Sequence, residues 1–132
     1  MTRREEREQA FILLFEKAFN AETDVAELYD FAIENEVITG SDFVKSLVFK
    51  TWENVENIDL VIEKYSVGWK LGRISKVALA VLRLALCEIL YFDDIPAGVS
   101  INEAVELCKK YAARDDASFV NGLLGNASKE LK

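Results

Sequence analysis

Residues 76–92 read KVALAVLRLALCEILYF, and this stretch decides the fold. Wound as a helix, it is apolar on nearly every side, which is typical of a helix buried at the centre of a protein. Its longest apolar run, residues 77–92, spans only 16 residues and contains Arg83 and Glu88, whereas a membrane-spanning helix needs about 20. Ser75 is well suited to cap the first turn. The stretch therefore predicts a central buried helix that other elements surround.

Helical periodicity continues outward from this stretch in both directions. The expected helices cover residues 3–19, residues 24–36 behind Thr23 as N-cap, a segment opened by Ser41, a short segment over residues 58–65, residues 76–92, a segment that starts at Ser100 or Ile101, and a last one that holds Phe119 to Ala127. Loops are expected at residues 66–75, 93–99 and 112–116. No stretch alternates as a strand does. The pattern predicts an all-α compact bundle of about six or seven helices in a single domain, residues 1–132.

The composition excludes several kinds of chemistry. The chain has no histidine, which removes histidine-based catalysis and histidine-ligated metals. Its two cysteines, Cys87 and Cys108, are too few for a four-thiolate zinc site, and their apolar helix faces favour core packing. Residues 68–72 lack the lysine and hydroxyl residue of a phosphate-binding loop. Acidic pairs at residues 93–94 and 115–116 lie near helix starts, where capping is favoured over metal binding. We therefore expect a protein without catalytic activity that binds neither a cofactor nor a metal ion.

Two further expectations concern location and the inside of the bundle. No signal-type apolar stretch follows the charged N-terminus, and unpaired cysteines fit a reducing compartment, so a cytoplasmic location is expected.

Arg83 lies within the apolar helix, and a buried charge is costly without a partner. We expect Arg83 to pair with Glu88, Glu103 or Glu106.

Charge is distributed unevenly along the chain. The net charge is −7, yet residues 64–87 carry five basic side chains and no acidic one. The first helix opens with Arg3, Arg4 and Arg7 among three glutamates, and Phe15 lies on the side of Arg3 and Arg7. Arginines beside an aromatic ring suit single-stranded RNA, whose phosphates meet arginine while its bases stack on rings. The alternative is a solvated first turn whose arginines pair with the glutamates.

Three segments together resemble the NusB family of transcription antitermination factors. They are REEREQAFILLF at residues 4–15, LGRISKVALAVLRLALCEIL at residues 71–90, and VSINEAVELCKKY at residues 99–111 followed by FVNGLL at residues 119–124. The resemblance implies an all-helical protein without catalysis. Family members bind the boxA element of nascent RNA together with the ribosomal protein NusE, and the pair joins an RNA polymerase complex that resists termination, notably on ribosomal RNA operons.

The resemblance also implies RNA contacts at both ends of the chain. Arg4 and Arg7 match the arginine-rich opening of the family, with Arg3 beside them, and Phe15 falls where the family often has a stacking aromatic. Near the other end, Asp115 and Phe119 fall in the segment that meets RNA in the family. A carboxylate there can accept hydrogen bonds from base amino groups.

Charge alone adds Lys76 and Arg73 as phosphate contacts. The candidate RNA-binding residues are thus Arg3, Arg4, Arg7, Phe15, Lys76, Asp115 and Phe119. Asn102 and Asn121 match the motif positions of Ile-Asn-Glu-Ala and Phe-Val-Asn-Gly, and we interpret both first as structural side chains that cap or tie a connection.

The sequence departs from the family in two respects. Three glutamates lie among the arginines of the opening helix, which weakens its positive field relative to the most basic relatives. Many relatives have aspartate and arginine where this chain has Ala78 and Leu79, which we expect to remove two polar groups from the edge of the basic region. The alternative function is therefore a protein-interaction module of NusB-like fold with weak or lost RNA binding. A partner face left unoccupied could also self-associate into a homodimer.

Overall fold

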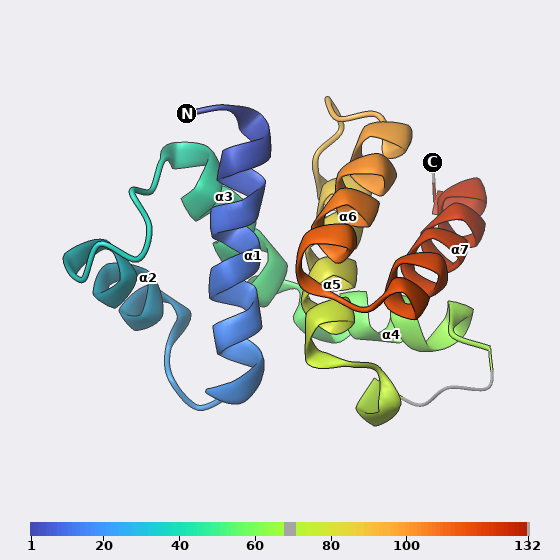
Figure 1. Ribbon diagram of the computed structural model, residues 1–132, viewed down its shortest axis with the longest axis horizontal. Coiled ribbons are helices and arrows are strands. Elements are labelled where there is room, and N and C mark those ends of the chain that lie inside the picture. The colour runs from blue at the N-terminus through green and yellow to red at the C-terminus, as the bar shows by residue number, and fades with distance from the viewer. Residues whose placement is uncertain (68–70, 132) are drawn as a thin grey trace.

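The computed structural model describes residues 1–67 and 71–131. Within these ranges it is all-helical, as predicted. The elements are α1 (Arg3–Phe19), α2 (Val25–Glu34), α3 (Asp42–Glu53), α4 (Val55–Tyr65), the short 3-10 helix η1 (Leu71–Arg73), α5 (Lys76–Tyr91), α6 (Ala97–Tyr111) and α7 (Arg114–Leu131). In Figure 1, α1, α2 and α3 lie to the left of α5 and α7 lies to its right, while α6 lies in front of α5 and α4 extends beneath α7.

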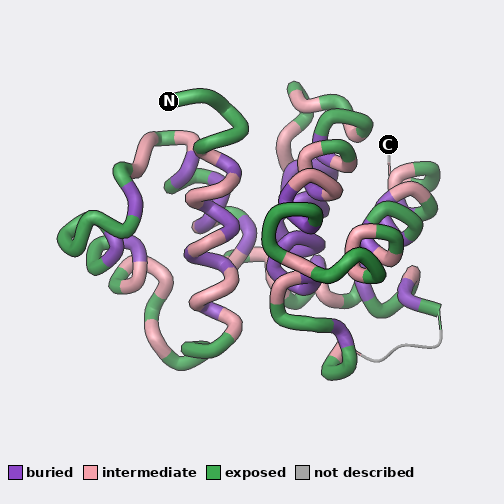
Figure 2. Tube along the Cα trace, viewed as in Figure 1, coloured by how far each residue is buried: buried purple, intermediate pink, exposed green. Residues whose placement is uncertain are grey.

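The central position predicted for the apolar helix is confirmed. Helix α5 packs against α1, α3, α4, α6 and α7. Every residue from Ala78 to Ile89 is buried, and Figure 2 shows this continuous buried segment at the middle of the molecule. Each large apolar side chain withdrawn from water there contributes about 1.5–3 kcal/mol. Most of the stability therefore depends on α5 and on the apolar stripes that face it.

Four helix starts differ from the prediction. Asp24, not Thr23, caps α2, because its side chain accepts a hydrogen bond from the backbone of Ala26. Helix α6 starts at Ala97, directly after Pro96, whose fixed φ angle suits a helix start. Helix α7 starts at Arg114, where two aspartates in the first turn favour the helix N-terminus. Helix α4 starts at Val55, three residues before the expected position. Ser41 and Ser75 cap α3 and α5 as predicted.

Arg83 has a different partner from the one predicted. Its guanidinium donates two hydrogen bonds of 2.9 Å to the carboxylate of Asp59 on α4 and lies 5.3 Å from the ring of Trp52. The glutamates proposed for it are engaged elsewhere: Glu88 and Glu103 hold Arg7 and Arg4. Sequence spacing could not reveal this because α4 reaches α5 only through the tertiary fold.

The interior agrees with one further prediction and corrects another. Cys87 and Cys108 are free and buried, in keeping with core packing. No helix in the described parts of the chain combines the length and apolarity needed to cross a membrane. Ala78 and Leu79, however, lie in the core and not at the edge of a basic region, with exposed fractions of 0% and 5%. In this chain the departure at these positions therefore concerns packing.

Candidate nucleic-acid interface

The first turn of α1 fixes where its arginines lie. Thr2 and Glu5 form a capping box, in which the Thr2 hydroxyl accepts from the Glu5 backbone and the Glu5 carboxylate accepts from the Thr2 backbone. These bonds satisfy N–H groups that a helix start leaves without partners. Arg3 and Arg4 are consequently presented to solvent on the first turn, whereas Arg7 turns inward.

Arg7 is part of a buried polar cluster and not of the exposed surface. Its Nε donates a 2.7 Å hydrogen bond to Glu88 of α5, and the side chains of Arg7 and Glu88 are only 6% and 0% exposed. Ser100 of α6 donates to the other carboxylate oxygen of Glu88 at 2.8 Å. The cluster joins α1, α5 and α6. The phosphate contact expected of Arg7 does not fit this position, because a buried and paired guanidinium does not face a ligand in solution.

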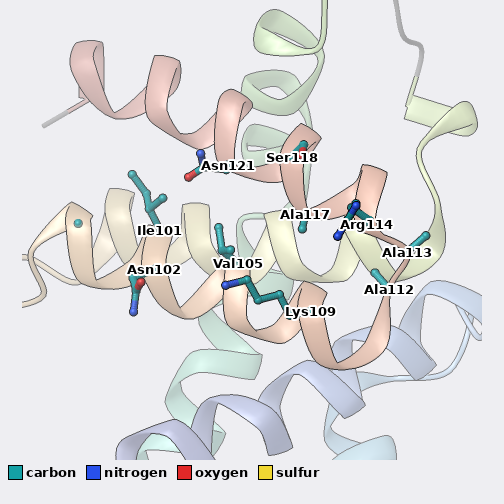
Figure 3. A pocket seen from close by; sticks show the side chains of 11 residues that line it. Ile101, Asn102, Val105, Lys109, Ala112, Ala113, Arg114, Ala117, Ser118 and Asn121 are labelled. Atoms are coloured by element: carbon teal, nitrogen blue, oxygen red, sulfur yellow. The ribbon is translucent and has the colours of Figure 1, made fainter.

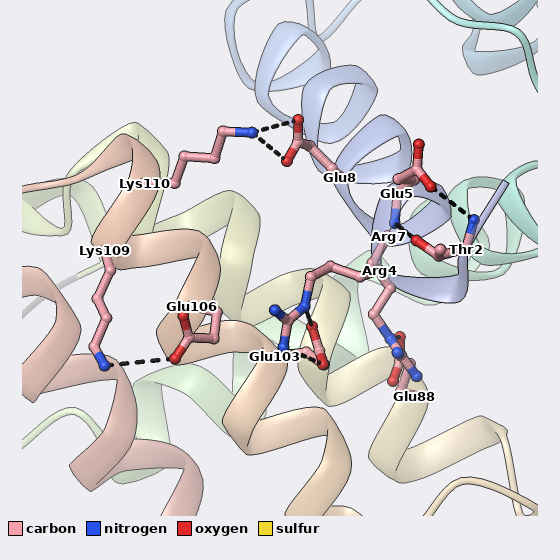
Figure 4. A network of polar contacts seen from close by, with 10 residues as sticks. All are labelled: Thr2, Arg4, Glu5, Arg7, Glu8, Glu88, Glu103, Glu106, Lys109 and Lys110. Atoms are coloured by element: carbon pink, nitrogen blue, oxygen red, sulfur yellow. Dashed lines mark hydrogen bonds and ion pairs between the residues drawn. The ribbon is translucent and has the colours of Figure 1, made fainter.

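Arg4 is exposed but paired across the molecule. Its Nε and Nη2 donate to the two carboxylate oxygens of Glu103 on α6, at 3.0 and 3.1 Å, and this hydrogen bond raises the pKa of Arg4 (Figure 4). One helical turn further along α1, Glu8 accepts two hydrogen bonds from Lys110 of α6. Between these pairs lies a shallow hollow of about 320 Å³ that Arg4, Glu103 and Lys110 line. Cations and carboxylates therefore alternate along the line where α1 meets α6, which we call the seam.

Arg3 has two local contacts on the other side of the helix start. Its Nη1 lies 3.3 Å from Glu6, and its guanidinium carbon lies 3.8 Å from the centre of the Phe43 ring. The Arg3 side chain is still 55% exposed. The first turn of α1 thus presents two exposed arginines, Arg3 and Arg4, which we call the arginine end.

The second half of the α1 surface is aromatic. Rings of Tyr111, Phe11, Phe15 and Phe19 follow one another, with neighbouring centroids 4.9, 6.0 and 5.1 Å apart. We call these four residues the aromatic ladder. Exposure grows along it from Phe11, which is 2% exposed, to Phe19, which is 61% exposed. The prediction placed Phe15 here but missed Phe19 and Tyr111. A phenylalanine every four residues, at positions 11, 15 and 19, was the signal in the sequence.

The start of α5 connects this ladder to the start of α7. Lys76 lies 5.9 Å from the Phe19 ring, and the next residue, Val77, lines a hollow of about 330 Å³ with Phe11 and Phe15. Just before the start of α5, Arg73 lines a smaller hollow of about 110 Å³ together with Asp115 and Phe119. Asp115 and Arg73 are exposed and Phe119 is half-buried.

The structure therefore brings most of the predicted residues onto one elongated surface. Arg4 and Phe15 are eleven residues apart on α1, which corresponds to about 16 Å along a helix. Such a length suits an extended strand better than a compact small molecule. No group of three or more metal-ligating side chains occurs among the residues described, and the acidic pair at 115–116 belongs to the first turn of α7.

The fold and this surface define a small all-helical protein with a face suited to single-stranded nucleic acid. The chain belongs to the NusB family, whose model matches residues 4–129.

Relatives with curated names are similar over nearly the whole chain. The transcription antitermination protein NusB of Ruminiclostridium cellulolyticum is 47% identical over 98% of this chain and 90% of its own. The transcription antitermination protein NusB of Natranaerobius thermophilus is 42% identical over 99% and 97%.

Solved structures agree with this assignment. T. maritima NusB superposes with a TM-score of 0.86 at 34% identity, over 98% of this chain and 92% of that one. A crystal structure of the antitermination factors NusB and NusE in complex with dsRNA gives a TM-score of 0.85 at 30% identity, over 97% and 96%.

Proposed function

We propose that this chain is a cytoplasmic transcription antitermination factor that binds boxA-type RNA together with NusE and joins an RNA polymerase complex on ribosomal RNA operons. The observation that carries the proposal is the similarity, over nearly its full length, to curated antitermination proteins and to a NusB solved with NusE and dsRNA. The proposed mechanism has no catalytic step, because binding alone joins the RNA to the complex.

In this proposal the elongated surface binds an unpaired RNA strand. Arg3 and Arg4 neutralise phosphates at the arginine end, while the rings of Phe15 and Phe19 stack on bases. Unpaired bases are needed because paired ones present no ring face to a side chain. Arg7 acts only as a positioning residue, since its bond to Glu88 fixes α1 against the core.

The second part of the strand would cross the starts of α5 and α7. Lys76 and Arg73 are exposed cations that can meet phosphates, and Asp115 can accept from the amino group of a base. Phe119 lies next to Asp115 in the same hollow and offers a further ring. The RNA path proposed here therefore runs from the first turn of α1 to the first turn of α7.

Cooperation with NusE follows from the modest charge of this surface. Phosphates must compete with Glu103 for Arg4, so we expect weak binding of RNA by the protein alone. Two weak contacts on one RNA reinforce each other through their effective concentration. If NusE contacts both this protein and the RNA, it should therefore strongly raise the affinity of this protein for the RNA.

The experiment is fluorescence anisotropy of a labelled boxA-type RNA, with the protein alone and then with NusE, and with a scrambled RNA as control. We expect binding that NusE strengthens and that scrambling removes. The logarithm of affinity should fall by about 0.7 per phosphate contact for each unit of log salt concentration. Absence of binding in every arm, by a folded helical protein, would leave the protein-interaction module as the better account. The comparisons do not favour that alternative, because the curated relatives are named for antitermination.

A further inference from the structure

A second surface of the molecule lies between α6 and α7, away from the aromatic ladder. It is an open groove of about 700 Å³. In Figure 3, Ile101 and Val105 of α6 face Ala117 and Ser118 of α7 across it, and the loop at Ala113 closes one end. Neither Asp115 nor Phe119 lines this groove. It shares Lys109 with the hollow beside Arg4 and Glu103, and its other lining residues lie outside that hollow.

Both motif asparagines belong to this groove. Asn102 and Asn121 are exposed residues in the interiors of α6 and α7, and both line the groove. The prediction that they cap or tie connections is therefore wrong. Asparagine is a poor helix former, so helix propensity does not explain either residue. Each carboxamide can donate to one partner group and accept from another, as a peptide unit does.

The charge of the groove is opposite to that of the whole chain. Among its lining residues Lys109 and Arg114 are basic and none is acidic, although the chain carries a net charge of −7. The nearest restraint on Lys109 is an exposed contact of 3.5 Å with Glu106 on its own helix, and such pairs contribute little. The groove thus favours an anionic partner.

The residues that line the groove also indicate which anionic partner fits better, single-stranded RNA or a protein segment. Single-stranded RNA binds on aromatic rings as well as cations, and no residue that lines this groove is aromatic. Small residues such as Ala112, Ala113 and Ala117 line it instead, which allows a peptide backbone to approach closely. The carboxamide of Asn121 on the α7 wall, with that of Asn102 at the rim, can pair with the N–H and C=O groups of such a backbone. These features favour a protein segment over RNA.

We propose that the α6–α7 groove binds an extended acidic peptide segment of a protein partner. Asn121 and Asn102 hydrogen-bond to its backbone, its apolar side chains contact Ile101 and Val105, and its carboxylates meet Arg114 and Lys109. The proposal does not depend on RNA binding. It gives the protein a second docking surface through which an RNA-bound factor can hold a further protein.

The test uses the full-length protein and a fluorescein-labelled twelve-residue peptide of alternating glutamate and valine, with a lysine–valine peptide as control. We expect saturable binding of the acidic peptide alone. Arg114→Gln should weaken it about tenfold, because the substitution removes a charge-assisted hydrogen bond to a peptide carboxylate. Asn121→Leu should weaken it about fivefold. Lys129→Gln is the matched control because Lys129 is an exposed cation on α7 outside the groove, and it should change affinity less than twofold.

Nuclear magnetic resonance locates the contact. Addition of the acidic peptide should shift the side-chain amide signals of Asn102 and Asn121, and neither an eight-nucleotide RNA nor NusE should prevent this. The proposal is overturned by absence of peptide binding, by equal effects of Arg114→Gln and Lys129→Gln, or by unshifted asparagine amides. Displacement of the peptide by the RNA or by NusE would also overturn it, because the groove would then belong to one of those interfaces. Loss of boxA binding with this groove intact would affect only the proposed function.

Discussion

Arg4 on the first turn of α1 and Glu103 on α6 face each other through two parallel hydrogen bonds of 3.0 and 3.1 Å. The Arg4 side chain remains 61% exposed, whereas that of Glu103 is 15% exposed. A phosphate can therefore reach the guanidinium but must compete with a carboxylate already seated on it. The same seam repeats this arrangement at Lys110 and Glu8. The protein itself thus supplies the competitor that limits its affinity for RNA.

Removal of this competitor should strengthen RNA binding. In Glu103→Gln the side chain keeps its shape but loses its charge, so Arg4 is released for phosphate. An exposed ion pair contributes about 0.2–1 kcal/mol, which corresponds to an increase in boxA affinity of up to about fivefold. Anisotropy at fixed salt measures the change. Glu63→Gln on α4 removes the same charge from an exposed position outside the seam, and an equal gain there would mean that net charge alone is responsible.

Phe19 offers the clearest test of base stacking. It is 61% exposed, so Phe19→Ala should change the free energy of unfolding little, while loss of a stacked base costs about 1–3 kcal/mol of binding. We expect boxA affinity to fall about fivefold or more. Phe31→Ala on α2 is the matched control, because Phe31 is 59% exposed and lies outside the aromatic ladder. Stacking would be refuted by equal affinities of the two variants.

The cysteines should be unreactive in the native protein. Burial raises the pKa of Cys87 to about 12 and that of Cys108 to about 11, so both stay protonated at pH 8. Only the thiolate is nucleophilic, and an unfolded cysteine with a pKa near 8.5 is partly ionised at that pH. Alkylation by iodoacetamide should therefore be at least about a hundredfold slower in buffer than in urea. Fast labelling of either thiol under native conditions would contradict this burial.

The bundle could be predicted from sequence because its signals are local. The apolar stretch at residues 76–92, the caps at Ser41 and Ser75, and the spacing of Phe11 and Phe15 all depend on near neighbours along the chain. The pairs that organise the candidate site join residues far apart in sequence, as in Arg4 with Glu103. Nothing local shows which glutamate each arginine will meet.

Arg7 shows most directly that a sequence motif does not reveal which of its side chains are exposed. Arg4 and Arg7 match the same arginine-rich segment, yet three residues of a helix turn a side chain by about 60° from its starting direction, and here that difference separates solvent from core. The family pattern could not distinguish the two. Arg7 is buried against Glu88 because α1 packs on α5, and this packing depends on the tertiary fold.

The two arginines should therefore respond differently to the same substitution. Arg7→Gln leaves Glu88 charged and buried without its cation, and breaking such a pair costs about 3–5 kcal/mol of stability. Arg4→Gln removes an exposed pair and should cost at most about 1 kcal/mol. Urea unfolding followed by circular dichroism measures both. In Arg7→Met/Glu88→Leu neither member of this pair is charged any longer, so much of the lost stability should return.

For RNA binding we expect the opposite ranking: among folded variants, the Arg4 substitution should have the larger effect. Arg4→Gln should lower the salt slope of boxA affinity by about 0.7, the value of one phosphate contact on a single strand. The folded Arg7→Met/Glu88→Leu variant should keep the slope of the unaltered protein, because Arg7 touches Glu88 and not phosphate. A slope lowered equally in both variants would mean that Arg7 leaves Glu88 when RNA binds. In that case the buried pair would be a state of the free protein, opened by the RNA itself.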